Sequence, residues 1–129
     1  MAHPNEDLLR KGYQAFAAGD MQTLSDLFAD DVVWHVPGQN PLAGTYRGKD
    51  EVFGFFAKVV EGTGGTFSLE IHDVLANDEH GVALVKAKAQ REGKSLEDNQ
   101  VNVLHLEGGK VHEFWGHASD SAAVDAFWS

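Results

Sequence analysis

Cysteine is absent from the 129-residue chain, and proline occurs only three times. Without cysteine the protein has no disulfide, no thiolate nucleophile and no Cys-ligated metal. Lysine and arginine are also scarce, with 10 of them against 20 Asp and Glu, which gives a net charge of −10. Phosphate backbones and anionic lipid surfaces repel an acidic chain, so we expect neither nucleic acid nor a membrane as a partner.

Long hydrophobic runs are missing as well, so no segment is expected to span a bilayer. Residues 1–12 lack the basic start and apolar stretch of a secretory signal, and we therefore expect a cytoplasmic protein. The chain is 43% hydrophobic and 23% charged, an ordinary globular composition. Its length predicts a single domain over residues 1–129.

The sequence contains none of the motifs that bind metals or nucleotides. Seven histidines are present, but none has the H-x-H or H-E-x-x-H spacing of a metal site. The glycine-rich stretches do not follow a strand and open a helix as phosphate-binding loops do. No serine has the context of a nucleophile elbow. We predict no metal and no cofactor.

The first half of the sequence predicts three helices. Asn5 and Asp20 are suitable caps for the first two, and Asp50 for a third over 51–61. Apolar residues recur at helical spacing in the first helix. Its expected inner face consists of Leu9, Gly12, Tyr13 and Phe16.

The remaining segments alternate between apolar and polar residues, which is typical of strands. The first is 32–38, with the sequence VVWHVPG, and the glycine- and proline-containing loop 38–48 follows it. Later strands are expected from Phe67 and over 82–91, 99–107 and 110–118. Helices followed by strands predict an α+β fold, with a bent antiparallel sheet curling over three N-terminal helices. The tail 119–128 is either a last helical turn or an edge cover.

Four segments resemble one known branch of proteins: 15–34, 41–56 (PLAGTYRGKDEVFGFF), 108–115 (GGKVHEFW) and 119–128. They are similar to the SnoaL-like polyketide cyclases and ketosteroid-isomerase-related proteins of the nuclear transport factor two-like superfamily. This resemblance implies a cone with one central pocket and a homodimer formed through the outer sheet face. The fold hosts isomerases, cyclases, epoxide hydrolases, dehydratases and non-enzymes, so it does not determine the function.

The ketosteroid isomerase pattern is changed at all three of its catalytic positions. The aspartate base of that pattern corresponds to Val36, and its protonated aspartate corresponds to Asn102. The tyrosine position corresponds to Gly12, with Tyr13 one step off the expected face. We therefore do not expect steroid isomerisation by that mechanism.

The same overlay assigns each strand residue to a face, because side chains alternate along a strand. The residues expected to face the pocket are Trp34, Val36, Val85, Gln100, Asn102, Leu104, His112 and Phe114. The residues expected on the outer face, and hence in the homodimer contact, are Val33, His35, Val103, His105, Trp115 and His117. A bulge in the last strand would shift this assignment.

Asp120 corresponds to the acid/base aspartate of SnoaL-like cyclases, and catalysis or helix capping both explain its position. Asn102 and Gln100 are neutral amides that either hold a ligand carbonyl or a water, or form hydrogen bonds to other pocket side chains. Either the Tyr13 hydroxyl reaches the cavity or its ring packs in the core. Trp34 and Phe114 are either flat cavity walls or core residues, and His112 is a candidate second titrating group. The sequence indicates a small apolar ligand. The protein is either a cofactor-free acid/base enzyme or a non-catalytic binding or dimeric interaction protein.

Overall fold

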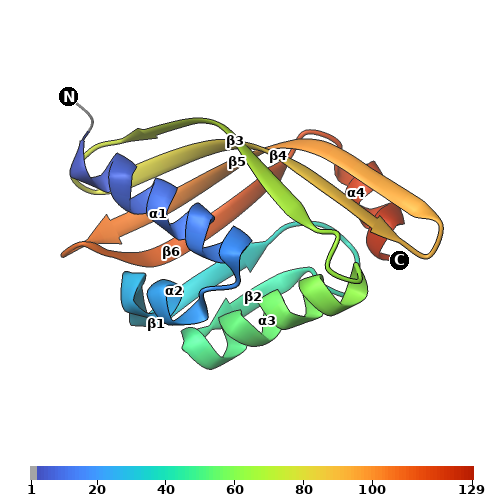
Figure 1. The fold of residues 1–129 in the computed structure, drawn as a ribbon, viewed down its shortest axis with the longest axis horizontal. Coiled ribbons are helices and arrows are strands. Elements are labelled where there is room, and N and C mark those ends of the chain that lie inside the picture. Colours follow the sequence, from blue (N-terminus) through green and yellow to red (C-terminus); the bar gives the residue numbers. More distant parts are fainter. Residues whose placement is uncertain (1–2) are drawn as a thin grey trace.

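The computed structural model describes residues 3–129, which form four helices around a six-stranded sheet (Figure 1). The helices are α1 (Pro4–Ala18), α2 (Met21–Leu27), α3 (Gly48–Gly62) and α4 (Ser121–Trp128). The strands are β1 (Phe28–Val36), β2 (Gly44–Arg47), β3 (Ser68–Ala76), β4 (His80–Arg91), β5 (Lys94–Glu107) and β6 (Lys110–Ala118). None of the helices described is long and apolar enough to cross a membrane.

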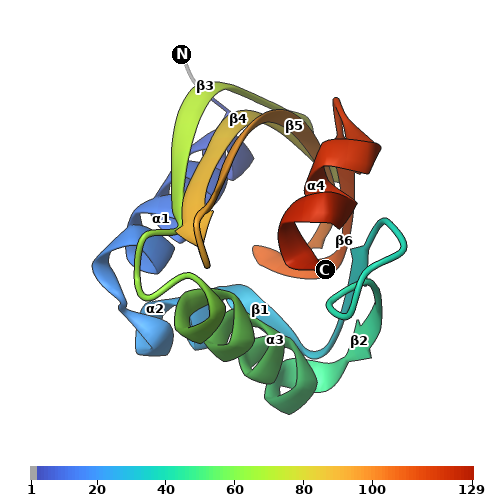
Figure 2. The same ribbon diagram turned by 90° about the vertical axis from the view of Figure 1, so that its right-hand side faces the viewer.

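The sheet bends around the helices, as the end-on view in Figure 2 shows. Its strand order is β2-β1-β6-β5-β4-β3. Helix α1 packs against β3 and β4, whereas α3 covers β1 and β2. The α+β cone predicted from the sequence is thus confirmed. The sheet differs from a purely antiparallel one at a single pairing, because β1 runs parallel to β6.

Two of the three predicted helix starts differ from the observed ones. Helix α1 begins one residue before Asn5, at Pro4, which fits the first helical position because it has no N–H to satisfy. His3 caps it and exchanges hydrogen bonds with Asn5 and Glu6. Asp20 caps α2 by accepting a hydrogen bond from the backbone N–H of Thr23, as predicted.

Helix α3 also begins earlier than predicted, at Gly48, so that Asp50 lies inside its first turn and does not cap it. The capping residue Arg47 is extended, and its backbone N–H donates to the Glu51 carboxylate. Arg47 also ends β2, a short strand in the predicted loop 38–48. This strand pairs with β1, for example Trp34 with Tyr46. A strand of four residues is too short for alternation of apolar and polar residues to be recognised in the sequence.

The core lies between the concave face of the sheet and the helices. Val32, Val52 and Leu106 are among its most deeply buried side chains. Helix α1 approaches β4 closely at Gly81, where an added Cβ would collide with Cδ1 of the buried Leu9 side chain. A glycine at this position therefore lets α1 lie against the sheet and form one wall of the cavity described next.

Candidate functional site

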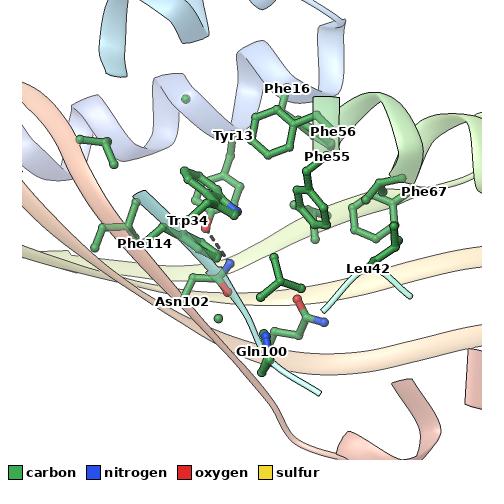
Figure 3. Close-up of a pocket in the computed structure, with 18 of the residues that line it drawn as sticks. Tyr13, Phe16, Trp34, Leu42, Phe55, Phe56, Phe67, Gln100, Asn102 and Phe114 are labelled. Carbon is green, nitrogen blue, oxygen red and sulfur yellow. Dashed lines mark hydrogen bonds between the residues drawn. The ribbon is translucent and has the colours of Figure 1, made fainter. Parts of the chain in front are cut away.

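A cavity of about 170 Å³ lies between the concave face of the sheet and the helices (Figure 3). Its walls come from α1, α2, α3 and α4, from the loop after β1, and from the inward faces of β1, β5 and β6. Aromatic rings form much of the lining. They belong to Tyr13, Phe16, Phe28, Trp34, Phe55, Phe56, Phe67, Phe114 and Trp128. Such a surface favours apolar, flat molecules.

Tyr13 and Asn102 form a polar pair in this aromatic cavity. Nδ2 of Asn102 donates a hydrogen bond of 2.8 Å to the Tyr13 hydroxyl oxygen, across from β5 to α1. Asn102 is 3% exposed and lines the cavity. Among residues 3–129, none accepts the hydroxyl proton of Tyr13 and none donates to Oδ1 of Asn102. The pair therefore retains the Tyr13 O–H and the second N–H of Asn102 as free donors, and Oδ1 of Asn102 as a free acceptor, for a ligand.

The tyrosine is held in its neutral form. Burial raises the pKa of Tyr13 to about 12 from its ordinary value of 10.0, and the hydrogen bond from Asn102 opposes this rise only in part. A neutral hydroxyl in an apolar cavity is a hydrogen-bond donor over the whole physiological pH range. It is suited to stabilise a carbonyl oxygen or an oxyanion.

Trp34 and Phe114 form a stacked wall beside this pair. Their ring centroids are 3.9 Å apart and their planes differ by 5°. The two residues are opposite each other in the parallel pairing of β1 with β6, which is why their rings meet. Phe114 also lies across from Leu104 of β5. The wall is therefore fixed by strand register on both sides.

The remaining polar lining residues are less buried and mark the mouth. Gln100 and Asn40 are half-buried, and His117 is exposed. Asn40 is already engaged, because Nδ2 donates to Asp125 of α4 at 2.8 Å and Oδ1 accepts from the Leu42 N–H. The side chain of Gln100 has no hydrogen-bond partner among residues 3–129 and lies in the cavity (Figure 3).

Comparison with known proteins agrees with this geometry. The family model of the SnoaL-like domain matches residues 9–114. An uncharacterised protein of Mycobacterium tuberculosis is 35% identical over 124 residues, which is 95% of each chain. The chain belongs to the SnoaL-like family.

Solved structures extend the comparison. Bal32a, from a soil-derived mobile gene cassette, is 35% identical with a TM-score of 0.96 and covers 99% of this chain and 98% of its own. A nuclear transport factor two-like protein of Burkholderia pseudomallei, described as of unknown function, is 26% identical with a TM-score of 0.87, and the match covers 98% of both chains. The superfamily and branch predicted from the sequence are thus confirmed.

Within this SnoaL-like fold, most of the predicted pocket residues come together. Those that line the cavity are Tyr13, Trp34, Val36, Gln100, Asn102, Leu104 and Phe114. Val85 faces inward as predicted, but it is 2% exposed and belongs to the packed core, outside the cavity lining. Tyr13 lines the cavity from α1 and also packs against the hydrophobic core.

The predicted position of His112 is wrong. The pairing of β5 with β6 shifts between His105–Glu113 and Leu106–Val111, so that His112 is an extra residue in a bulge. The bulge turns Val111 into the core and leaves His112 near His105 and Asp31, outside the cavity. A β-bulge displaces every side chain on one side of it by one position, and alternation counted from the sequence cannot detect it.

Asp120 lies outside the cavity lining and is exposed. Its carboxylate accepts a hydrogen bond of 3.0 Å from the Ala123 N–H and thereby caps α4. The tail 119–128 thus contains a helix whose Val124 and Trp128 close one side of the cavity.

Sequence reasoning missed Asp98, the one acidic side chain of residues 3–129 that is buried. It lies on the inward face of β5 between the lining residues Leu96 and Gln100. Its Oδ1 accepts hydrogen bonds from the Ser119 hydroxyl and the Asp120 N–H, while Oδ2 is buried with no partner. The signal that could have identified Asp98 is the alternation along β5, which puts this acid on the same face as Gln100 and Asn102.

The outer sheet face carries His35, His105 and Trp115 as expected. His117 was also expected there, but it lines the mouth of the cavity. His35 stacks on Trp115, with ring centroids 5.6 Å apart, and its Nε2 meets the Glu113 carboxylate. His105 lies near His80 and His112. Within the described range 3–129, no three His, Asp or Glu side chains gather as metal ligands would.

Proposed function

We propose that the protein binds a small, neutral, largely apolar molecule through an oxygen atom, with the Tyr13 hydroxyl as donor. The observation that carries this proposal is the Tyr13–Asn102 pair, which has unused hydrogen-bonding capacity inside an aromatic cavity. A ligand oxygen at this pair accepts a hydrogen bond from the Tyr13 hydroxyl. This bond takes the place of the one that the ligand oxygen makes to water in solution. The surrounding rings contribute affinity through burial of apolar surface.

Acetophenone is a suitable probe because it combines one aromatic ring with one carbonyl. We expect it to raise the melting temperature of the wild-type protein, since a ligand that binds only the folded state stabilises it. Tyr13→Phe should weaken binding by about threefold to tenfold, the effect of one hydrogen bond. Tyr46→Phe is the matched control, because the Tyr46 hydroxyl donates to the Leu42 carbonyl and does not line the cavity. Equal affinity in all three proteins would contradict the proposal.

A second candidate function is cofactor-free proton transfer on the bound carbonyl compound. A neutral hydroxyl aimed at a carbonyl oxygen makes the neighbouring C–H more acidic, which is the first half of an isomerase, cyclase or dehydratase reaction. The second half needs a base. His117 lines the mouth, and Asp120 is the base that the family resemblance implies.

Exchange of the methyl protons of acetophenone into deuterated water, followed by NMR, tests this function. Enzymatic exchange should fall in Tyr13→Phe and in the variant of the true base, His117→Ala or Asp120→Asn. Exchange no faster than in buffer, together with acetophenone binding, would leave the protein as a binding protein without this activity.

We also propose a homodimer through the outer face of β1, β5 and β6. This face carries Val33, Val103 and Trp115, and Val101 is 39% exposed there. Two chains of charge −10 repel each other, so an interface here relies on burial of these apolar side chains. Sedimentation should give a dimer for the wild type and a monomer for Trp115→Ala. A wild-type monomer would contradict this proposal.

A further inference from the structure

Gln100 is a second, separate polar position in the cavity. It lies two residues from Asn102 on β5, so both side chains point from the same face of the strand. Its amide group lies in the cavity and has no hydrogen-bond partner among residues 3–129 (Figure 3). A half-buried amide with no protein partner is free to serve as donor and acceptor to a ligand.

The distance between the two polar positions constrains the ligand. The Cα atoms of Gln100 and Asn102 are about 7 Å apart, because each residue of an extended strand advances the chain by about 3.3 Å, and the two amide groups start from these separate positions. Oxygen atoms on neighbouring carbons of a ligand cannot span this distance. Oxygens at opposite ends of a six-membered ring are separated by a similar span.

The lining also constrains the charge of the ligand. Among the residues of 3–129 that line the cavity there is no Lys, Arg, Asp or Glu. His117, the remaining ionisable lining residue besides Tyr13, is exposed at the mouth. An anionic carboxylate or phosphate would lose its hydration here without gaining a cation, which is strongly unfavourable. The ligand oxygens therefore belong to neutral groups.

The volume of the cavity constrains the size of the ligand. A cavity of about 150 Å³ with an apolar lining accommodates benzene. The cavity of about 170 Å³ in this protein is similar, and it has a mouth beside His117 and Asn40 through which a small substituent can extend. One ring with short substituents fills this space.

We propose, building on the proposed function, that the natural ligand is a neutral, single-ring compound with two oxygen functions at opposite ends of the ring. One oxygen binds at Tyr13 and Asn102, and the other binds the amide of Gln100. Gln100 thus determines specificity by distinguishing para-substituted rings from others.

Two isomers with the same atoms test this proposal: 4′-hydroxyacetophenone, whose oxygens lie at opposite ends, and 2′-hydroxyacetophenone, whose oxygens lie side by side. We expect the para isomer to bind the wild-type protein about threefold to tenfold more tightly than acetophenone, by calorimetry, through one additional hydrogen bond. The ortho isomer should show no such gain. Gln100→Leu should abolish the gain of the para isomer, measured within that variant as the ratio of its affinity for 4′-hydroxyacetophenone to its affinity for acetophenone.

Two further measurements separate the possible failures. The anion 4-hydroxybenzoate, which has a carboxylate in place of the ketone, should not bind, and binding as tight as that of 4′-hydroxyacetophenone would overturn the neutral ligand class. If acetophenone binds in a Tyr13-dependent way but the para isomer gains nothing, the role of Gln100 is wrong while the proposed function stands. If none of the neutral ketones binds, both are wrong. Gln100→Leu should fold normally, since no described residue hydrogen-bonds to this side chain, and its melting temperature verifies this.

Discussion

The two faces of β5 and β6 differ in chemistry although their residues alternate along the same strands. The inner face presents Asn102, Leu104 and Phe114, which are neutral and enclosed. The outer face presents Val103, His105 and Trp115, which are half-buried. A single backbone therefore carries a ligand cavity on one side and an apolar, histidine-rich surface on the other. Because the period of a strand is two, neighbouring residues have unrelated roles.

Substitution of neighbouring residues on the two faces should have the largest effect. Phe114 is 8% exposed and stacks on Trp34, so we expect Phe114→Ala to lower the free energy of unfolding by about 3–5 kcal/mol. Trp115→Ala should cost less than half as much, because the outer side chain is only partly buried. Urea denaturation of both variants at the same protein concentration measures the difference. Equal losses would show that the outer face is packed as tightly as the inner one.

The cavity on the inner side of the sheet should also respond to alkaline pH, through Tyr13 of α1. The pKa of Tyr13 is about 12 in the folded protein and 10.0 when the residue is free. Below pH 10 both states hold the proton, so this group does not change stability there. Between pH 10 and pH 12 the unfolded state loses its proton first, so the folded protein loses on the order of 2 kcal/mol.

Tyr13→Phe isolates this effect, because the variant lacks the titrating group. We expect the stability of the wild type relative to Tyr13→Phe to fall between pH 10 and pH 12 in urea denaturation. Parallel curves over this range would mean that the hydroxyl is already ionised or exposed in the folded protein.

A smaller effect on stability is expected at Asp98 and Glu97, two neighbouring acids of β5 that lie on its inner and outer faces. Asp98→Ala removes the acceptor for the Ser119 hydroxyl and the Asp120 N–H, and should cost about 1–3 kcal/mol. Glu97→Ala removes an exposed ion pair of 3.5 Å with Lys86 and should cost at most about 0.5 kcal/mol. Thermal unfolding of the two variants checks this. A larger loss from Glu97→Ala would contradict the assignment of faces along β5.

Sequence patterns predicted the fold and most of the cavity for an identifiable reason. The register is unbroken over residues 33–36 of β1 and along the pairing of β5 with β4, so alternation counted from Val36 and Asn102 placed Trp34, Gln100 and Leu104 on the correct face. The family resemblance supplied the anchor for that count. Regular backbone geometry is therefore what made these positions predictable.

The sequence-based predictions failed where the regular strand geometry is interrupted, or where contacts with distant parts of the chain determine the local structure. His112 was misplaced because the bulge of β6 has no marker in the sequence. Strand β2 is held by its pairing with β1, and four residues are too few to show a period. Asp98 itself follows the alternation of β5, whereas its hydrogen-bond partner Ser119 comes directly after β6, and only the fold brings the two together.

Asp120 should give the smallest effect and the clearest choice between two roles. Its carboxylate caps α4, so Asp120→Ala should lower the free energy of unfolding by about 1 kcal/mol, while Asp120→Asn should cost little because asparagine caps equally well. We expect the affinity for acetophenone to be unchanged in both variants, since Asp120 does not line the cavity. Denaturation and calorimetry on the same samples measure both quantities. Reduced acetophenone affinity in Asp120→Asn, with stability intact, would place the carboxylate at the ligand and favour the acid/base role over the cap.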